Sequence, residues 1–140
     1  MTLDLDGLQY PSATDPWDAT WLFIAVSVSA PDGHWSFREP CLEASDVLRL
    51  AAWLDGVARG ERLAAIEFTE PNLRFDLAPT EGRLPILRVG FELSARPPWR
   101  TKGFVDSDRD CYLDIEVAIT ALRAAADDLR EQLNKIRTDR

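Results

Sequence analysis

Three aspartates at alternate positions, Asp106, Asp108 and Asp110, have the spacing in this chain that comes nearest to a known chemistry. They match positions one, three and five of an EF-hand calcium loop. The rest of such a loop is missing, because Cys111 stands where a tight turn needs glycine and Val117 where a bidentate glutamate is needed. We therefore expect no metal site here, and predict either a solvated acidic loop or an acidic contact surface for a basic partner.

Histidine and cysteine, on which metal sites and nucleophilic catalysis often depend, are scarce. His34 is the single histidine and falls in a turn, Pro31-Asp32-Gly33-His34. The chain contains no Gly-x-Ser-x-Gly elbow, no His-Glu-x-x-His helix, no Cys-x-x-Cys pair and no glycine-rich phosphate loop. Cys41 and Cys111 lie beside apolar residues, so we expect buried thiols, with a disulfide as the alternative. The sequence predicts no catalytic residue and no cofactor.

Closely spaced carboxylates are the remaining candidates for catalysis, as a general acid and base. Three such pairs occur: Asp4 with Asp6, Asp15 with Asp18, and Glu67 with Glu70. A chain with 24 acidic residues in 140 forms such pairs by chance, and no pattern places a pair in a cleft. A carboxylate-dependent enzyme therefore stays an alternative only.

The formal net charge of −8 limits the class of partner. Direct nucleic-acid binding is disfavoured, because phosphate contacts depend on clustered Lys and Arg. A basic partner is favoured, although acidity can also serve solubility alone. Acids occupy the N-terminus where a signal peptide has bases, and the most apolar run, residues 21–28, has only strand length. We expect a cytoplasmic protein with no membrane contact.

Hydrophobic periodicity predicts an α+β fold with a largely antiparallel, hairpin-rich sheet, as a single domain over residues 1–140. Strands are expected over residues 22–30 and 35–38 as a hairpin, 64–68, 73–77, 86–95 and 111–117. The 73–77 and 86–95 strands have one polar face each, which is typical of antiparallel pairing. The longest loop is predicted over 96–109.

Two amphipathic helices are expected to pack on this sheet, one central and one C-terminal. Ser45 is the predicted cap of the first, and Gly60 its end. The second covers residues 117–137, with one narrow apolar stripe. Packing on its own sheet is favoured, which makes a monomer the expected state; a homodimer through this helix is the alternative.

The five tryptophans divide by context. Trp21, Trp35 and Trp53 fall in predicted regular elements, so we expect them in the core. Trp17 and Trp99 fall in loops rich in proline and aspartate, where each either anchors a protein interface or folds back over the sheet.

Several segments, taken together and in order, form a family pattern. They are Asp18-Ala19-Thr20-Trp21-Leu22, Pro40-Cys41-Leu42, Trp53-Leu54, Phe68-Thr69-Glu70-Pro71-Asn72-Leu73-Arg74-Phe75, Phe91-Glu92-Leu93-Ser94-Ala95-Arg96-Pro97-Pro98-Trp99, and Leu-Arg-Ala-Ala-Ala-Asp-Asp-Leu-Arg-Glu-Gln-Leu in the last helix. Over residues 8–133 the chain resembles the WapI-type immunity proteins. These are small cytoplasmic bacterial antitoxins that neutralise the C-terminal domain of a wall-associated or contact-dependent toxin.

The resemblance implies a non-enzymatic protein that binds a cognate toxin domain, often a nuclease. A nuclease presents a basic surface to RNA, which an acidic inhibitor can occupy. From their place in predicted loops, we assign the contact to Asp15, Asp18, Asp106, Asp108 and Asp110, with Trp17 and Trp99 as anchors. A small-ligand-binding or regulatory module with an aromatic sheet face remains the other alternative.

The corner Glu70-Pro71-Asn72 carries much of the resemblance but is predicted to be structural. Pro71 fixes its own φ and extends Glu70, and Asn72 is expected to bond local backbone. We therefore place the binding surface in the acidic loops elsewhere.

Overall fold

The computed structural model describes residues 1–100 and 111–139. The strands are β1 (Thr2–Leu8), β2 (Trp21–Ala30), β3 (Gly33–Glu43), β4 (Leu73–Ala78), β5 (Ile86–Phe91) and β6 (Tyr112–Glu116). The α-helices are α1 (Ala44–Ala58) and α2 (Ile119–Thr138), and the 3₁₀ turns are η1 (Asp18–Thr20), η2 (Leu93–Ala95) and η3 (Pro98–Arg100). The predicted α+β class with antiparallel strands is confirmed.

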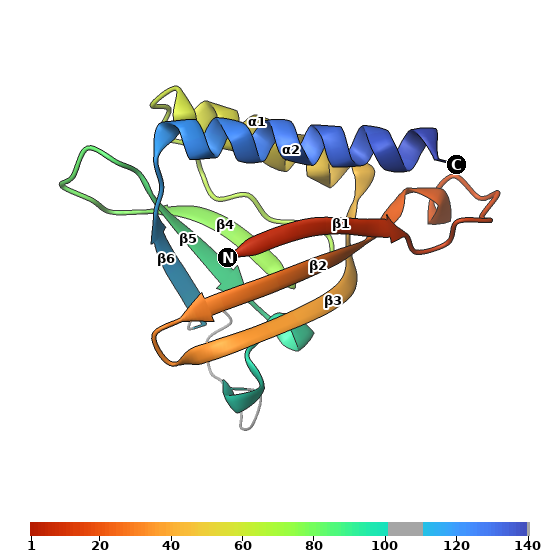
Figure 1. Cartoon of the computed structure of the whole chain (residues 1–140), viewed down its shortest axis with the longest axis horizontal. Helices are drawn as coiled ribbons and strands as arrows, with labels where there is room; N and C mark the ends of the chain where they lie inside the picture. Colours follow the sequence, from red (N-terminus) through yellow and green to blue (C-terminus); the bar gives the residue numbers. More distant parts are fainter. Residues whose placement is uncertain (101–110, 140) are drawn as a thin grey trace.

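The six strands divide into two three-stranded antiparallel sheets, ordered β1-β2-β3 and β4-β5-β6. Helices α1 and α2 lie side by side and cover both sheets, as the upper layer in Figure 1. The main core lies between the inner faces of the two sheets and these helices. In the described part of the chain, no helix has the length and apolarity needed to cross a membrane.

Strand β1 has no counterpart in the prediction from sequence, although Leu3 and Leu5 alternate there with Asp4 and Asp6. It pairs antiparallel with β2. Among its first six residues only two apolar side chains face inward, so the alternation is too short to predict a strand from sequence alone. The strand becomes evident only from its pairing with the edge of β2.

Both neighbours of β2 bulge opposite the same residue, Phe23. In β1, Asp6 and Gly7 lie opposite it, and Gly7 has a positive φ of 92°. In β3, Pro40 and Cys41 lie opposite it. A bulge is one of the few places in a sheet that accepts proline, because its residues leave the hydrogen-bonded ladder.

The second sheet is shorter than its sequence pattern predicts. Of the expected strand at 64–68, only an isolated bridge between Ile66 and Phe75 forms. Strand β5 stops at Phe91, because Leu93 adopts a left-handed φ of 52° and begins η2 instead of continuing the strand.

Helix α1 begins two residues earlier than expected. Ser45 lies inside the helix, so its prediction as the cap is wrong. The cap residue is Glu43, whose backbone N–H donates to the Asp46 carboxylate at 3.0 Å. The predicted end is confirmed, because Gly60 follows the helix with a left-handed φ of 85°.

The apolar stripe of α2 is buried within this chain. Its members Leu122, Ala126, Leu129 and Leu133 are buried, and the helix packs on α1 and β1. The Gln132 side chain also accepts a hydrogen bond of 2.7 Å from the backbone N–H of Leu5. The stripe that could have served a coiled-coil dimer is therefore already covered.

The prediction for the three core tryptophans is confirmed. Trp21 and Trp53 are buried, and Trp35 packs against the core. Two of the three also form hydrogen bonds: the Trp35 indole N–H donates to the Ala95 carbonyl at 3.0 Å, and that of Trp53 donates to the Ala64 carbonyl at 2.8 Å.

Candidate functional site

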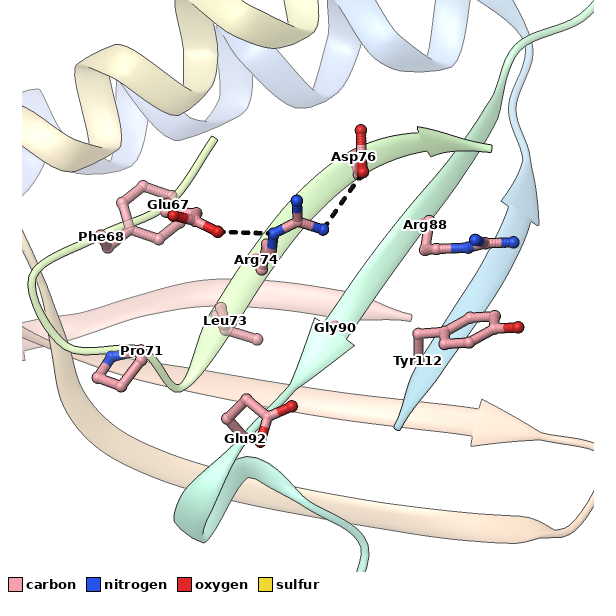
Figure 2. A pocket seen from close by; sticks show the side chains of 10 residues that line it. All are labelled: Glu67, Phe68, Pro71, Leu73, Arg74, Asp76, Arg88, Gly90, Glu92 and Tyr112. Carbon is pink, nitrogen blue, oxygen red and sulfur yellow. Dashed lines mark hydrogen bonds and ion pairs between the residues drawn. The ribbon is translucent and has the colours of Figure 1, made fainter. Parts of the chain in front are cut away.

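The outer face of the β4-β5-β6 sheet carries a hollow of about 420 Å³ (Figure 2). Its floor is Gly90, which lies in register between Arg74 on β4 and Tyr112 on β6. Because Gly90 has no side chain, the neighbouring side chains stand around an open space. A Cβ there would be 3.5 Å from that of Arg74, an ordinary contact.

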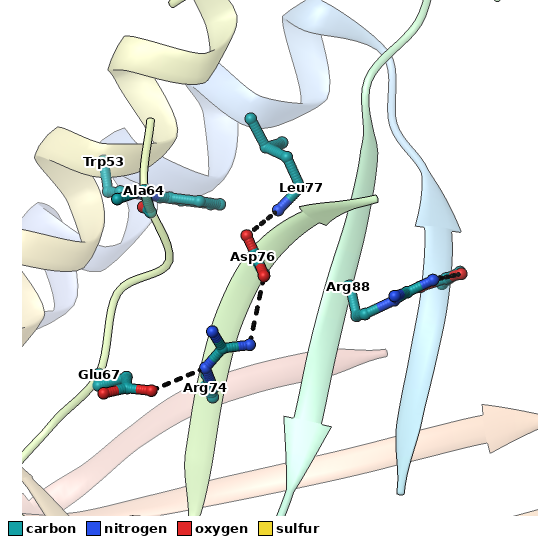
Figure 3. Close-up of polar contacts among 8 residues, drawn as sticks. Trp53, Ala64, Glu67, Arg74, Asp76, Leu77 and Arg88 are labelled. Carbon is teal, nitrogen blue, oxygen red and sulfur yellow. Dashed lines mark hydrogen bonds and ion pairs between the residues drawn. The ribbon is translucent and has the colours of Figure 1, made fainter. Parts of the chain in front are cut away.

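Charged side chains around this hollow are paired with one another. Arg74 donates to Glu67 at 2.8 Å and to Asp76 at 3.2 Å, as Figure 3 shows. Arg88 holds Asp114 through two hydrogen bonds of 2.9 and 3.0 Å, with its guanidinium 4.2 Å from the Tyr112 ring centroid. The face therefore presents charges that are largely neutralised in place.

The Arg88–Asp114 pair also shifts the pKa values of its own two members. Hydrogen bonding from Arg88 holds the pKa of Asp114 below its ordinary value, and the same bond raises the pKa of Arg88. Asp114 is thus an ionised carboxylate near neutral pH and a weak base, whereas efficient acid–base catalysis needs a pKa close to the working pH.

A more buried ion pair closes one end of the hollow. The Arg96 guanidinium donates to Glu92 at 2.7 Å, and the two side chains are only 9 % and 14 % exposed. The other Glu92 carboxylate oxygen, Oε1, is buried and has no hydrogen-bond partner among the described residues.

A second hollow, of about 500 Å³, lies at the start of β2. We call it the Trp17 groove. Its lining includes Tyr10, Trp17, Asp18, Glu39, Glu70 and Leu93. They come from the β1–β2 connection, β3, the segment before β4 and η2, so the fold gathers four distant stretches of chain.

Three large apolar side chains of the Trp17 groove are exposed. Trp17 and Leu93 are each 61 % exposed, and Tyr10 is 46 % exposed. Trp17 packs edge to face against the buried Trp21, with ring centroids 6.4 Å apart. It is therefore held from one side while most of its surface faces solvent.

Backbone irregularities shape the groove. Glu39 lies directly before the Pro40–Cys41 bulge of β3. The Asp15 carboxylate accepts a hydrogen bond of 2.8 Å from the Trp17 backbone N–H, which holds the turn leading into η1. Across the groove Leu93 has a φ of 52°, a conformation that a leucine rarely adopts.

Asn72 joins two walls of the Trp17 groove. It is 6 % exposed, and its side-chain amide donates to the Ser94 hydroxyl at 3.0 Å. Its backbone carbonyl accepts from the Glu92 N–H at 2.9 Å. The prediction that the Asn72 side chain bonds local backbone is wrong, because its partner lies 22 residues away.

The electrostatics of the Trp17 groove differ from those of the sheet face. Asp18, Glu39 and Glu70 line it, and no Lys or Arg of the described residues does. None of the three carboxylates forms an ion pair within the described part of the chain.

The thiol at the floor of the groove is not a nucleophile at neutral pH. Burial, with the nearby Glu39 carboxylate adding to it, raises the pKa of Cys41 to about 12. Cys41 and Cys111 are both buried thiols, which confirms the prediction for them and removes the disulfide alternative.

The predicted site residues do not form one cluster. Trp17 and Asp18 line the Trp17 groove and Asp15 supports its turn. Trp99 lies at the far end of the β2–β3 hairpin, where its indole donates to Asp32 at 3.1 Å. The Trp17 groove and Trp99 thus lie at opposite ends of β2, which has ten residues and a length of roughly 30 Å. Asp106, Asp108 and Asp110 lie outside the described residues.

Four residues of the groove escaped prediction from sequence: Tyr10, Glu39, Glu70 and Leu93. Glu70 carried the one available signal, since it begins the Glu-Pro-Asn corner. The others have no local pattern that separates them from surface residues, and their proximity arises only from the two bulged hairpins and η2.

Two of the three carboxylate pairs considered from the sequence are separated by the fold, whereas in the third the Asp15 carboxylate accepts a hydrogen bond of 3.4 Å from the Asp18 backbone N–H. Asp6 pairs with Arg38, whereas Asp4 accepts from Gln132 at 3.2 Å. Glu67 belongs to the sheet-face hollow and Glu70 to the Trp17 groove. Across residues 1–100 and 111–139, no group of three His, Cys, Asp or Glu side chains is arranged to hold a metal ion.

A third space bears on the ligand-binding alternative. An apolar cavity of about 240 Å³ lies between β1, the second sheet and α2, with Asp128 as its one charged lining residue. Pockets for small ligands usually measure about 300–1,000 Å³ and contain several convergent polar groups. The cavity is smaller and less polar than that, so it lends this alternative little support.

Comparison with known proteins gives one match. The model of the immunity protein WapI-like family matches residues 1–137. No curated protein and no solved structure matches the chain.

Proposed function

The chain belongs to the WapI-like immunity protein family, and from this premise we propose that it binds a cognate bacterial toxin domain and neutralises it without catalysis of its own. The observation that carries the proposal is the length of the family match, residues 1–137 of 140. Because the match covers the two sheets and both helices, the family relationship applies to the whole fold and not to one motif.

The proposed partner is a basic protein domain, with a nuclease as its expected activity. Two features favour this choice: the net charge of −8 and the three carboxylates of the Trp17 groove, which form no ion pair with the described residues. An acidic inhibitor can occupy the surface on which a nuclease holds its phosphates, and long-range attraction between opposite charges speeds capture. Such inhibition requires contact alone, and it takes place in the cytoplasm, where the toxin's RNA substrate is found.

The decisive experiment pairs this protein with the C-terminal domain of a large secreted protein encoded by a neighbouring gene. Expression of that domain alone should arrest growth of the host cell, and co-expression of this chain should restore growth. The two purified proteins should form a complex that weakens as salt concentration rises, because attraction between exposed charges is screened. A chain that neither restores growth nor binds this or any related toxin domain would show the proposal to be wrong.

A further inference from the structure

We propose that the Trp17 groove is the contact surface for the toxin domain and that it receives an arginine side chain of that partner, with the guanidinium placed between the exposed aromatic rings and the carboxylates of Asp18, Glu39 and Glu70. The proposal rests on the immunity function above and specifies the site and the chemistry of its partner.

The first support is the exposed apolar surface of the groove. Tyr10, Trp17 and Leu93 come from separate segments, and the fold brings all three into one hollow. Trp17 and Tyr10 are residue types that anchor protein interfaces, where a few large side chains supply most of the binding energy. Exposed large apolar side chains gathered in this way mark an interaction site.

The second support is the chemistry that the same chain uses for its own arginines. Arg38 stacks on Phe23, 3.7 Å from the ring centroid, and pairs with Asp6. Arg88 stacks on Tyr112 and pairs with Asp114. Each site combines an aromatic face, a carboxylate and a guanidinium, an arrangement that suits the flat, weakly hydrated arginine side chain better than lysine.

The Trp17 groove repeats two of these three components. It supplies aromatic rings and carboxylates, while no arginine or lysine of the described residues lines it. Like charges gathered without a counter-charge repel one another, so an incoming cation gains attraction from all three carboxylates. The complementary group must then come from the partner, which is basic in the proposed function.

The third support is the backbone conformation of Leu93. A left-handed leucine costs free energy, and this one is 61 % exposed, so burial within the chain does not offset the cost. Burial against a partner would offset it. By contrast, the charges of the β4-β5-β6 sheet face are already paired, so that face has less to offer a basic protein.

The test compares two double variants that remove the same charge. E39Q/E70Q neutralises two carboxylates of the groove, and E81Q/E116Q neutralises two exposed carboxylates outside it. The groove variant should bind the toxin domain about 30-fold or more weakly than the wild type, as should W17A. The control variant should lose less than about threefold, an effect of net charge alone.

A second arm uses argininamide as a probe and needs no toxin. Titration should shift the NMR signal of the Trp17 indole N–H more than that of Trp99, and E39Q/E70Q should abolish this difference. If the wild type binds the toxin domain and the groove variants bind equally well, the groove is not the contact surface and the immunity function stands. If the wild type ignores the toxin domain while argininamide still selects Trp17, the immunity function fails and the groove chemistry holds. Equal shifts of the two indoles overturn the arginine assignment.

Discussion

Asn72 and Ser94 are joined by a hydrogen bond of 3.0 Å between their side chains, across 22 residues of sequence. The bond fixes the segment before β4 to η2, on either side of the Trp17 groove. The Glu-Pro-Asn corner is thus structural, as its sequence predicts, but it holds in place the surface that we assign to the partner. Glu70 at its first position lines that surface.

Replacing Asn72 with alanine should destabilise the fold. Asn72 is only 6 % exposed. Its replacement removes a buried side chain and leaves the Ser94 hydroxyl without this donor. We expect the free energy of unfolding in urea to fall by about 1–3 kcal/mol. S94A should also destabilise the fold, because it leaves the buried Asn72 amide without its protein acceptor. Equal stability of N72A and the wild type would mean that the bond does not hold the groove together.

The Arg88–Asp114 pair should make a small contribution to stability that depends on pH. Because Arg88 lowers the pKa of Asp114 in the folded state, the contribution is fully present above the unfolded carboxyl pKa of about 4 and is lost as the pH falls through the lowered folded value. The side chains are 35 % and 38 % exposed, so screening limits the effect to about 0.5 kcal/mol.

Urea unfolding of D114N and the wild type at pH 7 and pH 2.5 measures this contribution. The difference in stability between them should be present at pH 7, shrink at pH 2.5, and also shrink in 0.5 M NaCl. A difference that stays constant across pH would show that Asp114 acts through packing and not through its charge.

The sequence predicts the individual helices and strands better than the contacts between them. The hairpin of β2 and β3, the C-terminal end of α1 and the stripe of α2 follow from the sequence pattern, because each is decided by residues close in sequence. The end of β5 is not decided in this way, because it coincides with the left-handed turn at Leu93, a residue with no intrinsic preference for that conformation.

The candidate site was predictable only in part for the same reason. Trp17 and Asp18 stand out as a tryptophan and an acid in one loop. Glu39 and Glu70 are separated by 31 positions and look like ordinary surface acids until the bulge of β3 brings the two segments to one hollow. Trp99 shares the loop-tryptophan pattern with Trp17, yet the fold places it at the other end of the hairpin.

Gly33 should be required for the position of Trp99. It has a φ of 148°, and a Cβ there would lie 2.8 Å from Cη2 of the Trp99 ring. G33A should therefore displace this ring from its edge contact with Trp35, now 5.7 Å between centroids, and lower the free energy of unfolding by about 1–3 kcal/mol. The indole signal of Trp99 reports the displacement.

A matched glycine variant separates the steric effect from the general effect of adding a methyl group. Gly82 lies in the β4–β5 turn without a positive φ, and its Cβ would meet only the Thr80 hydroxyl, at 3.4 Å. G82A should leave the Trp99 signal and the stability within about 0.5 kcal/mol of the wild type. If G33A also leaves both unchanged, the ring contact does not restrict Gly33. Toxin binding by G33A should stay near that of the wild type, because Trp99 lies outside the Trp17 groove.

Replacing Leu93 with glycine should separate folding from binding. The left-handed conformation costs a leucine about 1–2 kcal/mol, and glycine adopts it freely at an entropic cost of about 0.5–1 kcal/mol. L93G should thus be as stable as the wild type, or more stable by up to about 1 kcal/mol, in urea unfolding. Its affinity for the toxin domain should nevertheless fall about tenfold or more, because the exposed side chain is lost from the contact. L93M, which keeps an apolar side chain of similar volume, should retain most of the affinity. A gain in stability without any loss of affinity would leave the strained leucine without a role in binding, and would remove one of the three supports for the Trp17 groove.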